Sequence, residues 1–145
     1  MKALLIDVIE PKVTVVDCDG LDDYYKYIHC DCIDVTVRQV GSSFVHIVCD
    51  DVGALTSKPV ISASDMDGNN IYGNILIFSG ELVGDGFFQS LSADEMQDVL
   101  HNIFFAKSCL APYDDFHFVL RFNSSCWKVE QSVDNVEKLT YNYTK

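Results

Sequence analysis

The chain has 145 residues, of which 48% are hydrophobic and 12% aromatic, and 22 acidic residues against 10 basic ones give a net charge of −12. This length and apolar content exclude an intrinsically disordered chain and are sufficient for one domain with its own core. The negative charge disfavours direct binding to nucleic acid or to an anionic membrane, because both would repel the protein.

The first 30 residues predict two strands and a helix. Residues 3–9 and 13–16 have the short apolar pattern of strands. A helix is expected at about residues 20–29, with Asp19 as its N-cap. Its apolar face follows the i, i+3, i+4, i+7 spacing of Leu21, Tyr24, Tyr25 and Ile28.

The middle of the chain predicts a hairpin and a buried strand. Alternation over residues 33–38, a turn at 40–43 and a return over 44–49 are typical of a β-hairpin. Residues 56–70 read as irregular. The apolar run at residues 74–78 is short and bounded by glycines, so it predicts a strand buried on both faces, around which the other elements are placed.

The clearest local signal is a capping box at Ser92 and Glu95. It predicts a helix at about residues 92–106. The apolar stripe of this helix would consist of Met96, Val99, Leu100, Ile103 and Phe104. Residues 116–122 alternate apolar and polar side chains and predict another strand.

These elements do not alternate as strand and helix throughout, so they predict an α+β fold. We expect a largely antiparallel sheet of five to seven strands with two helices. The expected organisation is one domain over residues 1–130, followed by a polar C-terminal tail at 131–145.

The N-terminus lacks a long apolar core and a small-residue cleavage site, so we expect no secretory signal. No apolar run approaches the roughly 20 residues that cross a bilayer. The chain is therefore expected to be cytoplasmic, without membrane contact. In that compartment the six cysteines are expected to be free thiols.

Four short segments carry a likeness to a known family: DDVGAL at residues 50–55, KP at 58–59, IYGNILI at 71–77 and SLSADE at 90–95. Over roughly residues 3–105 the chain resembles a small domain family of unknown function from gut bacteria, their phages and their plasmids. The resemblance implies an accessory protein of a mobile element. It implies no site residues, because that family has no established activity.

Two segments resemble metal sites in part. His29-Cys30-Asp31-Cys32 holds one CxC pair, whereas zinc sites usually need two separated pairs, so buried cysteines are the favoured interpretation. In residues 65–70 the glycine is at the fourth position rather than the sixth that a calcium loop requires, which favours a simple turn. We expect no metal and no cofactor.

The acidic residues form clusters that suggest a surface for a partner. The candidate partner-binding residues are Asp17, Asp19, Asp22, Asp23, Asp50, Asp51, Asp114 and Asp115. Such a surface fits a basic, nucleic-acid-binding protein, because carboxylates can take the place of phosphates. The leading hypothesis is a non-catalytic, nucleic-acid-mimicking inhibitor of a host or defence protein, of the anti-restriction or anti-CRISPR type.

Two alternative functions remain open. One is a domain that binds and sequesters a small ligand or nucleotide, in a pocket lined by Tyr24, Tyr72, Phe87 and Trp127. The other is a cryptic hydrolase. The four histidines lie in no catalytic motif, so no catalytic residue is assigned and we do not expect an enzyme.

Overall fold

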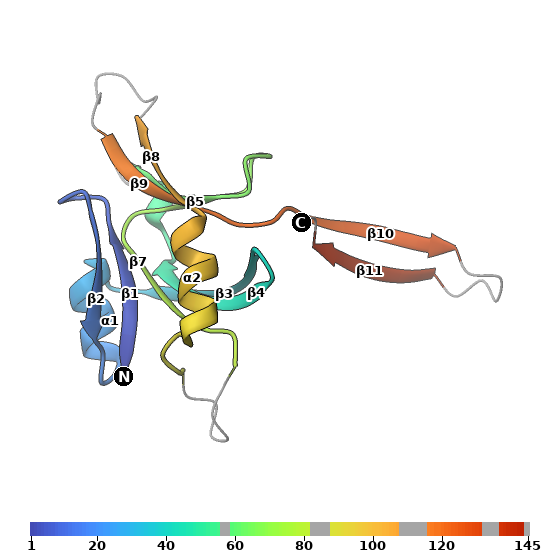
Figure 1. Ribbon diagram of the computed structural model, residues 1–145. Helices are drawn as coiled ribbons and strands as arrows, with labels where there is room; N and C mark the ends of the chain where they lie inside the picture. Colours follow the sequence, from blue (N-terminus) through green and yellow to red (C-terminus); the bar gives the residue numbers. More distant parts are fainter. Residues whose placement is uncertain (56–58, 82–87, 108–115, 132–136, 144–145) are drawn as a thin grey trace.

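The computed structural model of the protein describes residues 1–55, 59–81, 88–107, 116–131 and 137–143. Over these residues the chain forms two α-helices and eleven strands. The strands pair into sheets of five and four strands and a separate two-stranded ribbon (Figure 1). All strand pairs but one are antiparallel, so the predicted α+β fold with largely antiparallel pairing is confirmed.

The five-stranded sheet has the order β2-β1-β7-β4-β3. Its strands are β1 (Lys2–Asp7), β2 (Lys12–Asp17), β3 (Ile33–Val40), β4 (Ser43–Asp50) and β7 (Ile75–Ser79). Every residue of β7 is buried, and this strand pairs with β1 on one side and with β4 on the other. The strand predicted from the apolar run at 74–78 is therefore the central strand of the sheet.

The first predicted helix is α1 (Leu21–Ile28), but its cap differs from the prediction. Gly20 takes the N-cap position and makes no side-chain hydrogen bond. Asp19 lies one residue too early to cap the helix, and its backbone N–H donates to the Asp23 carboxylate at 2.7 Å. The helix ends at His29, whose backbone has a left-handed φ of 61°.

The second helix, α2 (Ala93–His101), begins with the predicted capping box. The Ser92 hydroxyl accepts a hydrogen bond from the N–H of Glu95, and the Glu95 carboxylate accepts one from the N–H of Ser92. These two bonds satisfy backbone donors that a helix start otherwise leaves free.

α2 ends at His101 rather than near residue 106, so the predicted helix was too long. The next residues form β8 (Ile103–Lys107), which pairs with β9 (Phe116–Arg121). Ile103 and its aromatic neighbours fit helical spacing but are favoured in strands, and the pairing with β9 decides the outcome. Leu100 is also 49% exposed, whereas Val99 is fully buried, so Leu100 does not belong to the core-facing stripe.

The four-stranded sheet has the order β6-β5-β9-β8. β5 (Ile61–Ser64) and β6 (Asn70–Tyr72) form a hairpin, and β5 also pairs with β9 in parallel. β5 lies inside the segment predicted to be irregular. That prediction was wrong because this four-residue strand is flanked by Pro59 and a turn, which masked its pattern.

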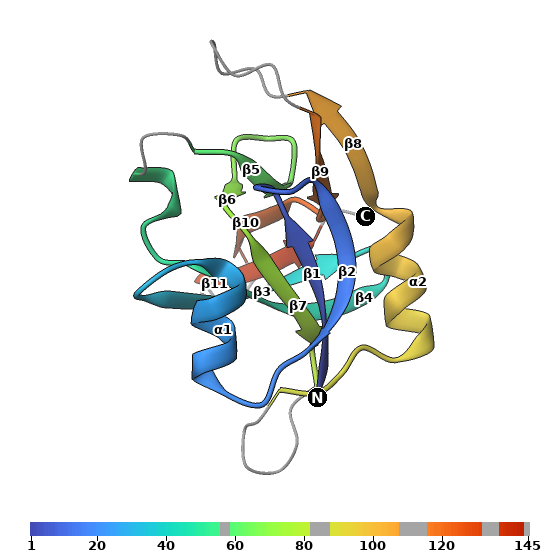
Figure 2. The same cartoon turned by 90° about the vertical axis from the view of Figure 1, so that its left-hand side faces the viewer.

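The core consists of two clusters, one on each face of the five-stranded sheet. Figure 2 shows the two helices, α1 and α2, on opposite sides of this sheet. Leu76 and Phe78 of β7 pack with residues of α1 on one face. Ile75 and Ile77 pack on the other face with residues of α2 and of the four-stranded sheet. The alternation follows from the two-residue period of a strand, which buries a continuous apolar run between two layers.

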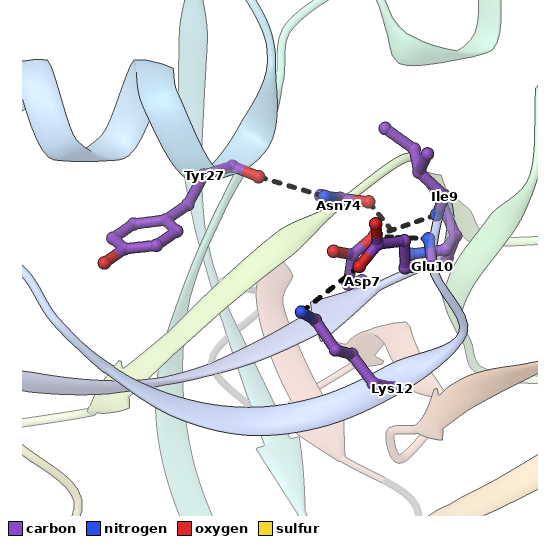
Figure 3. Close-up of polar contacts among 7 residues, drawn as sticks. Asp7, Ile9, Glu10, Lys12, Tyr27 and Asn74 are labelled. Atoms are coloured by element: carbon purple, nitrogen blue, oxygen red, sulfur yellow. Dashed lines mark hydrogen bonds and ion pairs between the residues drawn. The ribbon is translucent and has the colours of Figure 1, made fainter.

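A buried asparagine joins three of these elements (Figure 3). The Asn74 side-chain oxygen accepts a hydrogen bond from the Val8 N–H at 2.9 Å, and its amide donates to the carbonyl of Tyr27 at 2.9 Å. The nearby Asp7 carboxylate accepts hydrogen bonds from two backbone N–H groups of the turn after β1. These bonds fix the end of β1, the end of α1 and the start of β7 relative to one another.

Two smaller elements complete the described chain. A short 3-10 helix, η1 (Gly53–Leu55), follows β4. The ribbon of β10 (Ser125–Gln131) and β11 (Glu137–Tyr143) extends to one side in Figure 1, across the domain boundary expected after residue 130. In the part of the chain that is described, neither helix has the length and apolar character needed to cross a membrane.

Candidate functional site: an acidic surface and a groove

Acidic side chains gather at the start of α1. Asp17 ends β2, and Asp19, Asp22 and Asp23 surround the first turn of the helix. All of them are exposed except Asp23, which is half-buried. Negative charge is favourable here for the helix itself, since the helix dipole places partial positive charge at this end.

A second acidic group lies at the other end of α1. It combines Asp31 and Asp34, around the start of β3, with Asp50 and Asp51, at the end of β4. The Asp51 N–H donates a hydrogen bond of 3.1 Å to the carbonyl of Cys32, which brings the two segments together.

An eight-residue helix is about 12 Å long, so the two acidic groups lie at the ends of one short element. We call the two groups together the acidic surface, which consists of Asp17, Asp19, Asp22, Asp23, Asp31, Asp34, Asp50 and Asp51. Six of the eight predicted partner-binding residues belong to it. The remaining two, Asp114 and Asp115, lie outside the described residues.

Few cations neutralise the acidic surface. The described residues contain three ion pairs, of which two involve this surface: Lys2 with Asp17 at 3.0 Å, and the N-terminal amine with Asp19 at 3.9 Å. The hydrogen bond and positive charge of Lys2 lower the pKa of Asp17. In the described part of the chain, the side chains of Asp22, Asp31 and Asp51 make no hydrogen bond or ion pair, so their charge faces solvent uncompensated.

The second feature is a groove of about 430 Å³ on the four-stranded sheet. Its sides come from the two edge strands, with Asn70 and Tyr72 on β6 and Phe104 and Ala106 on β8. Residues of the two inner strands, β5 and β9, lie between these sides. The core-facing residues of the same strands, such as Leu120, pack toward the five-stranded sheet, so the groove occupies the opposite face.

The floor of the groove consists of Ile61 and Ser64 from β5 and of His117 and Val119 from β9. The pairing of β8 with β9 places His117 directly opposite Ala106. His117 and Val119 are 5% and 4% exposed, so this floor is nearly closed to solvent.

The β5–β6 turn forms one rim of the groove, through Met66 and Gly68. The Asp65 carboxylate accepts hydrogen bonds from the N–H groups of Asp67 and Asn69 and from the Asn69 amide. Burial works to raise the pKa of Asp65, but these hydrogen bonds hold it below its ordinary value. Residues 65–70 thus form a turn, as predicted, and the Asp65 carboxylate holds it in place.

His117 is the unusual residue of the groove. Among the buried side-chain nitrogen and oxygen atoms of the described residues, its Nδ1 is the one that has no hydrogen-bond partner. Buried polar groups are nearly always paired, because leaving one unpaired costs about 1–3 kcal/mol. An unpaired imidazole nitrogen on the floor of a groove is therefore a candidate contact for a ligand.

Of the four aromatic residues predicted to line one pocket, the two whose side chains are described, Tyr24 and Tyr72, do not lie together. Tyr24 lies on the buried side of α1 and packs against Phe78, with ring centroids 5.7 Å apart. Tyr72 lines the groove on the other sheet. Phe87 lies outside the described residues, and Trp127 is described only as part of the backbone of β10.

The His29–Cys32 segment follows α1, and its side chains form no metal cluster with other described residues. No group of three His, Cys, Asp or Glu side chains within the described ranges could hold a metal ion. The four described cysteines are free thiols. Burial and nearby carboxylates raise the pKa of Cys30 to about 11 and that of Cys49 to about 12, which keeps both thiols protonated.

His46 has a structural environment. It is buried, its Nδ1 lies 2.8 Å from the carbonyl oxygen of Ser79, and its ring packs on Phe88 at 5.2 Å. The ring therefore links β4 to the end of β7. We assign no catalytic role to it.

A protein-family model described as "Domain of unknown function (DUF3846)" matches residues 1–103. This match confirms the family resemblance seen over roughly residues 3–105. No curated protein and no solved structure matches the chain. The matched residues contain the whole acidic surface and the β5–β6 side of the groove, whereas β9 follows them.

Proposed function

The chain belongs to the DUF3846 family, a family defined by a domain of unknown function, and from this premise we propose that it is a non-catalytic interaction protein that binds a basic protein surface. The binding region is the acidic surface around α1. The proposed partner is a nucleic-acid-binding protein of the host or of its defence systems, met in the cytoplasm. The protein would inhibit this partner by occupying its nucleic-acid site.

One observation carries the proposal: three separate segments bring eight aspartates to the two ends of one short helix. Aspartate is common at turns and helix starts for local reasons, and this explains single positions. It does not explain why so few cations lie beside these carboxylates. Uncompensated carboxylates in such an array raise the free energy of the isolated protein and attract a basic partner.

The net charge of the chain favours a protein partner over nucleic acid. At −12 the chain repels phosphates, whereas a basic surface built for phosphates attracts it. Short aspartate side chains hold their carboxylates close to the backbone, which limits the entropy lost on binding. The mobile-element context implied by the family resemblance supports an inhibitor of host proteins.

The test is capture of proteins from a bacterial lysate at about 0.1 M salt, where the Debye length is about 10 Å. Wild type is compared with the triple variant Asp22→Asn, Asp31→Asn and Asp51→Asn, which removes three exposed carboxylates that make no side-chain bond. The matched control, Asp94→Lys with Gln97→Lys, changes the net charge by the same three units on the exposed side of α2.

Three results together support the proposal. Wild type and the α2 control retain the same protein, the triple variant retains much less of it, and added double-stranded DNA elutes it. Equal capture by the triple variant would refute a role for the acidic surface. Capture that DNA does not disturb would refute occupation of a nucleic-acid site, and so would the absence of any captured protein.

A further inference from the structure

The acidic surface does not account for the groove, which lies on the other sheet. Its floor contains an imidazole nitrogen that is buried and unpaired, although most of its lining surface is apolar. We propose that this groove binds a small, uncharged, flat heteroaromatic molecule, and that a ring heteroatom of this ligand pairs with Nδ1 of His117.

The size of the groove fits a small molecule. Its volume of about 430 Å³ lies within the range of small-molecule sites, roughly 300–1,000 Å³. Its two sides are edge strands separated by two inner strands, so their backbones stand about 14 Å apart at the usual strand spacing. Once the side chains are subtracted, a molecule of one or two rings fits between Tyr72 and Phe104.

The walls favour a flat, apolar ring. Ile61 and Val119 give a hydrophobic floor, and one aromatic side chain stands on each side. Aromatic rings attract other rings in offset and edge-on arrangements, beyond the gain from burying apolar surface. A pocket of apolar walls with a few placed polar groups is also the usual form of a small-molecule site.

The charges favour an uncharged ligand. None of the residues that line the groove in the described structure is acidic, so nothing there would hold a cation. The net charge of −12 repels an anion over longer distances. Lys107 also lines the groove, but it already takes part in another interaction.

Among the described polar atoms that line the groove, Nδ1 of His117 is the one that is both buried and unpaired. Ser64 donates a hydrogen bond to Asn70 Oδ1 at 2.6 Å and accepts one from the N–H of Met66 at 3.0 Å. Those side chains are thus engaged with each other. A ligand heteroatom that reaches His117 Nδ1 would form the hydrogen bond that this nitrogen lacks in the free protein. The groove should therefore bind a heterocycle more tightly than a plain hydrocarbon.

The experiment is an NMR titration of the full chain with four probes of similar size. Indole supplies a ring N–H donor, quinoline a ring nitrogen acceptor, benzoate a negative charge and benzamidine a positive charge. We expect indole or quinoline to shift the signals of His117, Val119 and Phe104, with a dissociation constant on the order of 1 mM, as suits nine or ten heavy atoms. Benzoate and benzamidine should bind at least about tenfold more weakly.

Two substitutions at His117 separate ligand contact from a structural role. His117→Leu removes the polar atom and should weaken binding of the neutral probe by about tenfold or more, while the melting temperature stays equal or rises. His117→Asn keeps a polar atom near the position of Nδ1 and should bind within about threefold of wild type. A lower melting temperature of His117→Leu with unchanged binding would assign His117 to the fold instead.

Ala106→Leu is the independent variant, because Ala106 lies opposite His117 and the larger side chain narrows the groove without changing the imidazole. This variant should abolish binding of the neutral probe. If His117→Leu does not fold, Ala106→Leu provides the test of binding in the groove. The proposal is overturned if no neutral probe shifts the groove signals, if a charged probe binds more tightly, or if Ala106→Leu binds like wild type.

Discussion

The side-chain amide of Asn74 donates a 2.9 Å hydrogen bond to the backbone carbonyl of Tyr27, and this bond ties the start of the central strand to the end of α1. The same side chain accepts a hydrogen bond from the N–H of Val8. Asn74 is only 2% exposed, so water does not readily replace either bond. The acidic surface lies at the two ends of the helix that this contact positions.

Replacement of this asparagine by alanine tests that link. Asn74→Ala leaves two backbone groups without partners inside the protein, at about 1–3 kcal/mol each, so we expect a loss of about 2–6 kcal/mol in the free energy of unfolding. Urea denaturation measures it. Gln97→Ala, on the exposed side of α2, should stay within about 0.5 kcal/mol of wild type. A stable Asn74→Ala protein would mean that the contact does not hold α1.

The orientation of α2 gives a second prediction. Val99 is fully buried and Leu100 is 49% exposed, so Val99→Ala should cost about 2 kcal/mol and Leu100→Ala less than about 0.5 kcal/mol. Ser92→Ala should cost about 1 kcal/mol, because it removes the cap that accepts the Glu95 N–H. Chemical denaturation of the three variants gives the ranking. A larger loss at Leu100 than at Val99 would contradict the described orientation.

The helical spacing of α2 was readable in sequence, but its end and the facing of Leu100 were not. Capping depends on residues close together in the chain, so Ser92 and Glu95 could be paired from spacing alone. The end of the helix depends on β9, which starts at Phe116 and competes for Ile103 as a strand partner. No local pattern reports that competition.

The candidate sites were also predictable from the sequence only in part. The clusters around Asp22 and Asp51 were visible in sequence, and so was the β3–β4 hairpin that brings the segment before β3 to the end of β4. The position of α1 between the two clusters depends on its packing against Leu76 and Phe78 of β7, which are distant in the chain. The groove was missed, because its floor needs β5 beside β9, a parallel contact between distant segments. Among the described residues that line the groove, Tyr72 was the one that sequence reasoning had selected as a pocket residue, and nothing in the sequence marks the Nδ1 of His117 as unpaired.

Glu95 predicts a pH dependence of stability. Burial works to raise its pKa, but hydrogen bonds from the Ser92 N–H and the Ser79 hydroxyl, each 2.8 Å long, lower it below its ordinary value near 4.5. A carboxylate with a lowered folded pKa stabilises the protein above its unfolded pKa, and this contribution disappears as the pH falls through the folded pKa. The stability difference between wild type and Glu95→Gln should therefore be constant above about pH 5.5 and shrink below about pH 4.5.

Urea denaturation at a series of pH values from above about 5.5 to below about 4.5 measures this difference. Asp94→Asn is the control, since Asp94 is exposed in the same turn and its side chain makes no hydrogen bond in the described structure. A difference for Glu95→Gln that does not change with pH would show that the carboxylate bonds contribute nothing to folding.

Thiol reactivity gives the fourth prediction. Burial raises the pKa of Cys18 to about 11 and that of Cys49 to about 12, so on the order of one thiol in a thousand or fewer is ionised at pH 8. Among the four cysteines whose side chains are described, Cys32 is the exposed one, and it should react before the other three with a thiol reagent in the native protein. Cys32→Ser should remove that fast phase, and peptide mapping of the labelled protein identifies the site. Rapid labelling of Cys18 or Cys49 would contradict their described burial.

The central claim is that the acidic surface drives association with a basic partner, and the association rate constant of the captured protein tests it most directly. We predict that the rate for wild type falls by about tenfold or more between 0.1 M and 1 M salt, where the Debye length shrinks from about 10 Å to about 3 Å. At 0.1 M the Asp22, Asp31 and Asp51 triple variant should associate at least several-fold more slowly than wild type, and the α2 control at the wild-type rate. Equal rates for the triple variant and wild type, or a rate independent of salt, would contradict the account.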